Sequence, residues 1–393
     1  MGVLDGVRVL DFGRYIAGPY CAALLGDLGA EVIRVEKREG SEDRFVAPLS
    51  ETGEGAMFFQ MNRGKRSMTL DPMRDEGREI VRKLVQTADV VVANLPPPTL
   101  KQMGLDYDSL AASKADIILT TASAFGDGGP YSSRVGFDGI GQVMAGGTYM
   151  TGTEDQPYRA AVPFIDFTTA VHCAFGTMAA LMHRAKGGGG QIVEGQLLGS
   201  ALTLNNALLM EQAVLTRDRV PTGNRGQTSA PNDLFQAKDG WMLVQIVGQP
   251  LYERWAKLMG EPSWLTDPRF KDDLARGDHG HLISARTQEW CRNLTRAEAL
   301  AALEKARIPA APVLKPQETL DDPHVKAMGY LHPVEFPGLP RPAPVAKPPV
   351  RLGRTPARVP PPPPRLGADT DAILGDLGYG KPDIDRLRQN GVV

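Results

Sequence analysis

The sequence predicts an α/β protein in which a large Rossmann-like domain with a parallel sheet is joined to a smaller α+β domain. Three observations support this fold class. A chain of 393 residues is long enough for two domains. Short β-rich runs alternate with amphipathic stretches over residues 1–125, as they do in βαβ units. The composition changes at the turn-rich segment 221–226, after which the pattern of a smaller unit begins.

Four runs in the first part have the composition of buried strands, namely residues 8–12, 31–35, 89–92 and 116–119. Residues 19–29 lie between the first two runs and show an apolar face followed by glycine, which predicts a crossover helix. Residues 75–88 show the same pattern before the third run. Strands joined by helices in this way predict a parallel sheet.

Two long apolar helices are predicted next, over residues 166–185 and roughly 197–215. The first is too short to span a bilayer cleanly and carries His172, so we expect a buried core helix. His172 and His183 fit packing or surface positions better than catalytic ones. After them, a strand over 241–247 and helices up to about residue 305 indicate the smaller domain.

Prolines dominate residues 333–364, which indicates an extended connector that builds no core. The tail 370–390 has helical spacing of Leu374, Leu377, Ile384 and Leu387, which must dock against another part of the protein. The chain thus reads as a large first part, a smaller unit after residue 226, and a connector with a helical tail from residue 333.

Composition limits the function. Lys and Arg total 44 against 46 for Asp and Glu, so we expect neither nucleic acid nor a membrane surface as partner. Cys21, Cys173 and Cys291 lack the spacing of a zinc site or a disulfide framework, and we predict no metal. The N-terminal residues show no secretion signal, so a cytoplasmic protein with a small-molecule ligand is expected.

A dinucleotide site is disfavoured. The turn at residues 13–18 lacks the G-x-G-x-x-G pattern, although the second strand is followed by Glu36 where a ribose-binding acid would lie. Basic residues near strand ends and loops fit either the phosphates of a ligand such as CoA or solvated surface charge. They are Lys37, Arg38, Arg44, Arg63, Lys65, Arg66 and Arg134.

Asp166 at the start of the first apolar helix has two interpretations. It fits a helix N-cap that accepts backbone N–H bonds. It also fits a nucleophile, because a helix N-terminus would keep the carboxylate ionised and ready to attack an acyl carbon.

Several motifs along the whole chain together resemble the family III CoA-transferases, which include formyl-CoA transferase, carnitine and bile-acid CoA-transferases and the related α-methylacyl-CoA racemases. The motifs run in order from LDGVRVLDFGRYIAGPYCAALLGDLGAEVIRVEKREGSEDR and NRGKRSMTLD through SAFGDGGPYSSRVGFDGIGQVMAGG and IPAAPV to DDPHVKAMG and PRLGADTDAILGDLGY. The resemblance implies a large Rossmann-like domain over residues 1–224 and a smaller domain over residues 225–330. It further implies that the proline-rich connector and C-terminal segment, residues 331–393, return to the large domain. It also implies a homodimer whose two chains interlock like linked rings.

The resemblance also implies positions for the ligands. Asp166 in PFIDFTTA matches the family's nucleophile, and no permanently bound cofactor is implied, since CoA and acyl-CoA are substrates. Gln102 stands where a phosphate-contacting Arg is common, and residues 93–98 depart from the usual E-N-F-x-P-G. The implied CoA contacts are Lys37, Arg38, Leu70, Asn94, Leu95, Gln102, Met103 and Arg134, and the implied substrate or lid residues are Ile16, Gly223, Arg225 and Gly226.

The implied reaction moves CoA from an acyl-CoA donor to a free carboxylic acid. We expect succinyl-CoA as the donor and a small dicarboxylate as the acceptor. Arg44 and Arg225 are the candidate cations for the distal carboxylate of the acceptor. Aspartyl anhydride and aspartyl-CoA thioester are the implied intermediates. The segment 223–226 is a candidate lid or source of oxyanion donors. Members of the racemase branch carry a histidine acid/base group in a G-H-D segment, which here reads Gly136-Phe137-Asp138, and phenylalanine has no group that can exchange a proton. A non-catalytic acyl-CoA-binding protein is the other alternative, and it would not need Asp166.

Overall fold

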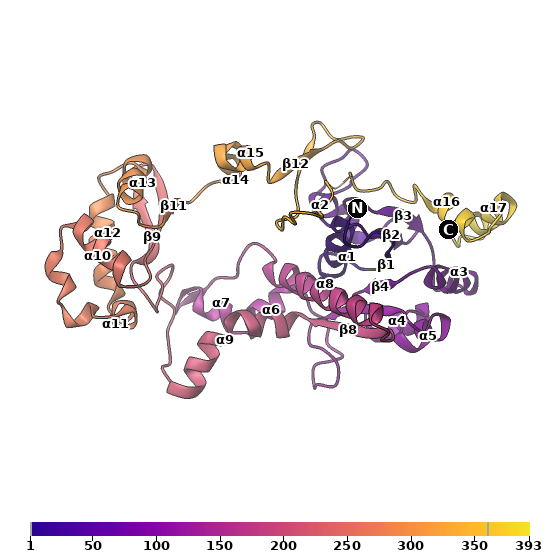
Figure 1. Ribbon diagram of the computed structural model, residues 1–393, viewed down its shortest axis with the longest axis horizontal. Coiled ribbons are helices and arrows are strands. Elements are labelled where there is room, and N and C mark those ends of the chain that lie inside the picture. Colours follow the sequence, from indigo (N-terminus) through magenta and orange to yellow (C-terminus); the bar gives the residue numbers. More distant parts are fainter. Residues whose placement is uncertain (1, 360) are drawn as a thin grey trace. The chain divides into compact units, whose positions relative to one another are not determined.

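A six-stranded parallel sheet forms the centre of the larger part of the protein (Figure 1). The computed structural model describes residues 2–359 and 361–393. The strand order is β3-β2-β1-β4-β5-β8, and every pairing is parallel, which confirms the predicted α/β class. The strands are β1 (Arg8–Asp11), β2 (Glu31–Glu36), β3 (Arg66–Thr69), β4 (Val90–Ala93), β5 (Ile118–Ser123) and β8 (Gln191–Gln196).

Helices cover both faces of this sheet, because alternate strand residues point to opposite sides. Leu10 and Ile33 pack on one side with α3 (Asp75–Gln86), α4 (Pro97–Met103) and α5 (Tyr107–Ser113). Val9 and Val32 pack on the other side with α1 (Ala17–Asp27) and α8 (Phe164–Ala185). Strands buried on both faces account for the continuous apolar runs from which they were predicted.

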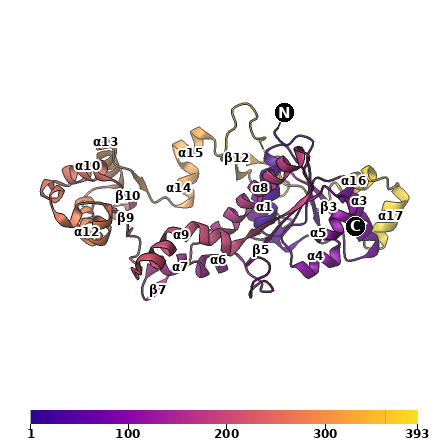
Figure 2. The same cartoon turned by 60° about the horizontal axis from the view of Figure 1, so that its bottom comes forward.

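The C-terminal tail packs on the same core as α3. It forms two helices, α16 (Thr370–Asp376) and α17 (Lys381–Gln389), which lie beside β3 and α3 in both views (Figures 1 and 2). Leu374, Ile384 and Leu387 are buried there, so the expectation that the tail docks is confirmed. Gly378 has a φ of +86° between the two helices, which explains why the predicted single helical stretch is broken.

The proline-rich segment forms a small core together with Phe59. Its strands β12 (Leu331–Val334) and β13 (Ala343–Ala346) form an antiparallel pair. Phe336 packs edge-on against Phe59 of α2 (Ala56–Met61), with ring centroids 5.1 Å apart. The prediction that this segment builds no core is therefore wrong, because two short strands pair here and their apolar side chains pack against α2.

The smaller unit has a three-stranded antiparallel sheet in the order β11-β10-β9. Tyr252 and Trp255 are at the centre of its core. The chain divides so that the larger unit runs to Ala145 and continues through Ala160–Leu209 and Ala327–Val393, and the smaller unit holds the rest. The elements of the smaller unit include β9 (Asn232–Ala237), β10 (Gly240–Gln245), β11 (Ala310–Pro312), α10 (Gln249–Met259), α11 (Asp273–Asp278), α12 (Gly280–Cys291), α13 (Arg296–Lys305), α14 (Pro316–Asp321) and, up to Lys326, α15 (Pro323–Met328).

Helix α8 is buried on one side and exposed on the other. It is long and apolar enough to cross a membrane by length and composition, and 44% of its most apolar window is buried. Its inner side packs against α1 and the sheet. Val171, Phe175 and Met182 are exposed on it, with Phe175 at 76%. The prediction of a buried core helix therefore holds for one side, and the other side carries uncovered apolar surface.

Candidate active site

Asp166 is the third residue of α8, which begins at Phe164, two residues before the predicted start. Pro163 occupies the N-cap position, and the cap makes no side-chain hydrogen bond. The interpretation of Asp166 as the N-cap is therefore wrong. The free N–H groups of this helix end find their acceptor in a residue far away in the sequence.

That acceptor is Asp138, the first residue of α6 (Asp138–Met144) and a buried side chain. Its Oδ2 accepts hydrogen bonds from the backbone N–H of Ile165 at 2.7 Å and of Asp166 at 3.1 Å. Its Oδ1 accepts a bond from the Gln142 side-chain amide. Asp138 was not among the predicted site residues, because an acid that opens a short helix gives no sign in the sequence that it caps another helix.

The environment of Asp166 favours its neutral form. Burial raises the pKa of Asp166 to about 7, the charge of Asp138 adds to this rise, and a backbone hydrogen bond opposes it. The raised pKa opposes the expectation that the helix end keeps this carboxylate ionised. A carboxylate with a raised pKa is more basic, and hence a stronger nucleophile once it is ionised.

Aromatic contacts place Asp166 near the carboxyl end of the sheet. Tyr20 in α1 packs edge-on against Phe167, the neighbour of Asp166, with ring centroids 5.0 Å apart. Tyr15, in the loop that joins β1 to α1, packs against Phe137, the neighbour of Asp138, at 5.5 Å. The starts of α1, α6 and α8 therefore meet where β1 ends. Ligands of open α/β sheets bind at this edge, at the point where the strand order reverses, here between β1 and β4.

The loop between β1 and α1 is fixed by Asn94. The Oδ1 atom of Asn94 accepts from the Arg14 N–H at 2.6 Å, and its Nδ2 donates to the Arg14 carbonyl at 2.9 Å. Asn94 was predicted as a CoA contact, and its amide is occupied by this loop. Ile16 in the same loop is 4% exposed. The loop is thus held rigidly beside the candidate site.

Buried ion pairs lie beneath this loop, and we call them the Asp11 network. Asp11 accepts from Lys65 at 2.7 Å, and Arg34 donates to the Gly13 carbonyl at 2.9 Å and to Asp43 at 2.8 Å. Burial lowers the pKa of Lys65 to about 8. For Asp11, burial would raise the pKa, but Lys65 and Arg34 outweigh it and hold the pKa below its ordinary value. The Asp11 network thus fixes the loop between β1 and α1 through the Gly13 carbonyl.

Several of the predicted cations are structural. Arg44 is 1% exposed, pairs with Glu36 at 2.5 Å and stacks on Phe58 at 3.9 Å, so it is not free to meet a distal carboxylate as expected. Arg63 is likewise buried in a pair with Asp27. Both arginines are therefore neither available to bind CoA nor solvated surface charges.

The remaining predicted CoA residues follow the strand ends of the larger unit. Lys37 and Arg38 come directly after β2 and Leu70 after β3. Lys37 pairs with Glu42, and Arg38 has no ion pair with any residue in 2–359 or 361–393. Leu95 follows β4 and is partly buried on the core. At the end of α4, Gln102 is exposed and Met103 is buried. Arg134 lies in an exposed loop, where its guanidinium stacks on the Tyr131 ring at 3.9 Å.

Three of the predicted substrate or lid residues, Gly223, Arg225 and Gly226, lie in the smaller unit, and the backbone N–H groups of both glycines are occupied. The N–H of Gly223 donates to the Gly152 carbonyl at 2.6 Å, and that of Gly226 donates to the Asn232 carbonyl at 2.6 Å. Arg225 points a guanidinium nitrogen at the Gly277 carbonyl, 3.5 Å away. The suggestion that Gly223 and Gly226 offer free oxyanion donors does not fit this arrangement. Their role as a lid stays a prediction.

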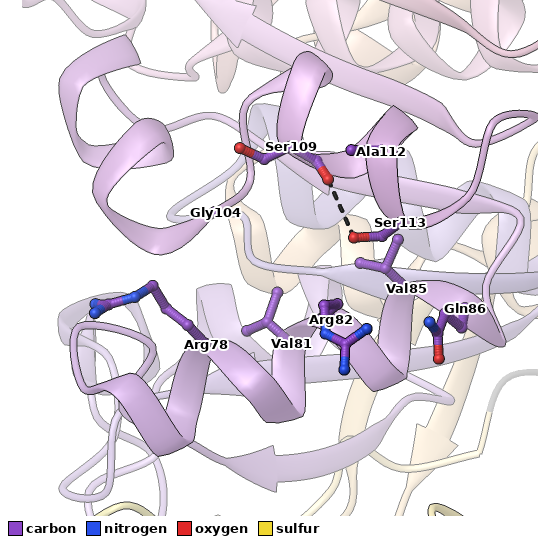
Figure 3. A pocket seen from close by; sticks show the side chains of 9 residues that line it. All are labelled: Arg78, Val81, Arg82, Val85, Gln86, Gly104, Ser109, Ala112 and Ser113. Atoms are coloured by element: carbon purple, nitrogen blue, oxygen red, sulfur yellow. Dashed lines mark hydrogen bonds between the residues drawn. The ribbon is translucent and has the colours of Figure 1, made fainter.

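A pocket of about 400 Å³ lies between α3 and the α4–α5 region, where Figure 3 shows its side chains. None of the predicted site residues lines it. Arg78 and Arg82 on its wall pair with Asp75 and Glu79 of their own helix. Its charge is therefore largely neutralised, and we assign it no ligand.

Comparison with known proteins identifies the family of this chain. The sequence model of CoA-transferase family III matches residues 4–370. The succinyl-CoA–D-citramalate CoA-transferase of Chloroflexus aurantiacus is 32% identical over 99% of this chain and 98% of its own. The succinate–glutarate CoA-transferase of Agrobacterium fabrum is 32% identical over 95% of both chains.

A solved structure agrees with the fold. A CaiB/BaiF family protein from Brucella suis superposes with a TM-score of 0.83 at 31% identity, over 96% of this chain and 99% of that one. A family model that spans nearly the whole chain, relatives of matching length and a shared fold all agree. The chain therefore belongs to CoA-transferase family III.

Proposed function

We propose that this enzyme transfers CoA from succinyl-CoA to a small dicarboxylic acid, or to a hydroxy or methyl derivative of one, with Asp166 as the covalent nucleophile. The observation that carries the chemistry is the setting of Asp166, a partly buried carboxylate at a helix start beside a second carboxylate, with its pKa raised to about 7. Perturbed acids of this kind are typical of catalytic positions.

The proposed reaction proceeds in balanced steps. The Asp166 carboxylate attacks the donor thioester carbonyl, the C–S bond breaks, and a mixed anhydride and CoA thiolate form. The thiolate attacks the aspartyl carbonyl, and the donor acid leaves as a carboxylate. The acceptor carboxylate then attacks the aspartyl-CoA thioester, and the released thiolate attacks the acyl carbon of the new anhydride. Asp166 is regenerated, and no proton is gained or lost.

The proposed CoA groove follows the carboxyl edge of the sheet. Lys37 and Arg38 after β2 supply positive charge there, and the N-terminal end of α1 adds backbone N–H groups. Arg38 has no ion-pair partner in the described chain and is the more available of the two. Gln102 donates and accepts neutral hydrogen bonds where a cation is common, which leaves Lys37, Arg38 and Arg134 as the proposed phosphate contacts.

The names of two relatives, which pair succinyl-CoA or succinate with D-citramalate and glutarate, support the proposed donor and acceptor classes. With succinyl-CoA as donor, we expect glutarate and citramalate to give new CoA thioesters, detected by mass spectrometry. Butyrate and pentanoate, which lack the second carboxylate, serve as matched controls and should react at least about tenfold more slowly. A preference for the monocarboxylates would contradict the proposed acceptor class.

Two further measurements separate the other functions. Calorimetry should show binding of CoA and none of NAD, since residues 13–18 lack the dinucleotide fingerprint. Reaction in D₂O should leave the α-carbon of the acyl group unlabelled. Deuterium at that carbon without exchange of CoA between acids would instead indicate a racemase.

We also propose that the protein is an interlocked homodimer. Within the larger unit, α8 and the first part of α9 (Leu197–Leu215) carry exposed apolar side chains, such as Phe175 and Leu204, and exposed apolar patches are typical of protein interfaces. Sedimentation velocity over a wide dilution range should show a dimer at every concentration, because linked chains separate only on unfolding. A folded monomer at low concentration would contradict interlocking.

A further inference from the structure

We propose that Asp138 is a positioning residue of the transfer reaction, which holds the first turn of α8 and thereby fixes the Asp166 carboxyl group beside its own negative charge. This inference deepens the proposed function and rests on Asp166 as the nucleophile. It assigns a role to a buried side chain that touches no reacting atom and acts through the main chain.

The geometry supports a bridge between two helices. Asp138 opens α6, and its Oδ2 holds the N–H groups of Ile165 and Asp166 at 2.7 and 3.1 Å. The second N–H belongs to the nucleophile itself, so any movement of Asp138 changes the position of the Asp166 Cα. Gln142 extends the bridge, since its amide donates to Asp138 and its Oε1 accepts from the Ala160 N–H at 3.0 Å.

This use of a carboxylate carries an electrostatic cost. A neutral Ser or Asn caps a helix about as well as Asp does, so capping alone needs no charge. The charge at Asp138 instead disfavours ionisation of Asp166 and adds to the effect of burial on its pKa. The same side chain thus sets the place and the basicity of the nucleophile.

Few other charged groups face Asp166. The raised pKa has burial and Asp138 as its causes, and no cation contributes. On α1, Tyr20 contacts Phe167, and Asp27 is paired with Arg63. Strand β5 carries no ionisable side chain. The remaining ionisable groups on the packed elements are Cys21 of α1, Glu194 of β8, Glu211 of α9, and His172, Cys173, His183 and Arg184 of α8.

The test is the pH dependence of kcat/KM for succinyl-CoA with the full-length enzyme. Wild type should lose activity as pH falls through about 7, because Asp166 must be ionised to attack. Asp138→Asn keeps an oxygen for both N–H groups and removes the charge, so the acid limb should move to lower pH by about one unit. Asp138→Ala should shift the limb in the same direction and also reduce the plateau rate, because the first turn of α8 loses its acceptor.

Gln142→Ala is the matched control. It removes the same side-chain bond to Asp138 that Asp138→Asn loses, and it leaves both carboxylates in place. The acid limb of its pH profile should stay at the wild-type pH, even if its plateau rate differs. Titration of the substrate affects all variants alike, so it cannot cause a difference between their acid limbs. An unmoved limb in Asp138→Asn would overturn the proposal, as would equal shifts in Asp138→Asn and Gln142→Ala.

Failure of this inference can be told apart from failure of the proposed function. If hydroxylamine traps Asp166 during wild-type turnover and the limb of Asp138→Asn does not move, Asp166 is the nucleophile and Asp138 has no such role. If Asp166 is never modified while transfer proceeds, the proposed function fails, and the role of Asp138 fails with it.

Discussion

Asp166→Asn should lower the rate of CoA transfer by about 10³-fold or more and leave CoA binding intact. An amide cannot form the anhydride or the thioester, whereas the proposed CoA contacts lie on other elements. Rates should be measured by product formation and binding by calorimetry, on protein whose mass confirms the amide. A rate within about tenfold of wild type would show that the carboxylate does no covalent work.

Trapping gives an independent measure of the same role. Hydroxylamine added during turnover should convert Asp166 to a hydroxamate, because activated acyl groups react with it readily. Peptide mass mapping locates the label, and Asp138 is the internal control, since its carboxylate is occupied by three N–H donors. Full-rate transfer with Asp166 unlabelled would contradict a covalent mechanism.

Asp166→Asn should be more stable than the wild-type protein at alkaline pH. The pKa of Asp166 is 3.8 in its ordinary state and about 7 in the folded protein. Between these values the folded protein binds more protons than the unfolded chain, so wild-type stability falls as pH rises through this window. About three pKa units correspond to at most about 4 kcal/mol at pH 8. The Asn variant has no such loss, so urea unfolding should show it more stable at pH 8 than wild type, with a smaller difference at pH 5.

Much of the fold could be predicted because its signals are local. In the run 31–35, Val32 packs on one face of the sheet and Ile33 and Val35 pack on the other, while α3 shows one apolar face, so the apolar pattern identified both elements. The predicted start of α8 lies two residues after the observed one, because the first N–H groups of the helix are capped by Asp138 and not by a neighbour in sequence. The small core around Phe336 was missed because proline content dominated that segment.

The candidate site was only partly predictable. Asp166 was singled out by a motif, but the position of its acidic neighbour depends on the packing of α6 against α8, which leaves no mark in either segment. Basic residues near strand ends were equally misleading. Arg44 and Lys65 were considered as CoA ligands or surface charges, yet each has a buried acid 8 or 54 residues away in sequence. Arg34, in the middle of an apolar strand, drew no attention.

Arg34→Met should destabilise the protein by about 3–5 kcal/mol, because it leaves buried acids without their cation. The guanidinium of Arg34 is fully buried, binds both oxygens of Asp43 at 2.8 and 3.1 Å and lies 3.5 Å from Asp11. Methionine fills much of the same volume, so the loss measures charge and hydrogen bonding more than packing. Urea unfolding at a fixed protein concentration gives the change, and transfer activity should fall too, since Arg34 also holds the Gly13 carbonyl at the candidate site.

The double variant Arg34→Met with Asp43→Asn separates an unpaired charge from lost packing. Because it removes the orphaned carboxylate, it should be more stable than Arg34→Met alone, although two residues are changed. The deficit of the single variant should also shrink from pH 8 to pH 5, because the pKa of Asp43 is already raised by burial and rises further without the opposing charge of Arg34. Arg82→Met, in an exposed pair with Glu79 on α3, is the matched control and should change stability little. If Arg34→Met and Arg82→Met are equally harmless, water or a rearranged side chain satisfies Asp43, and the Asp11 network is not what holds the loop between β1 and α1.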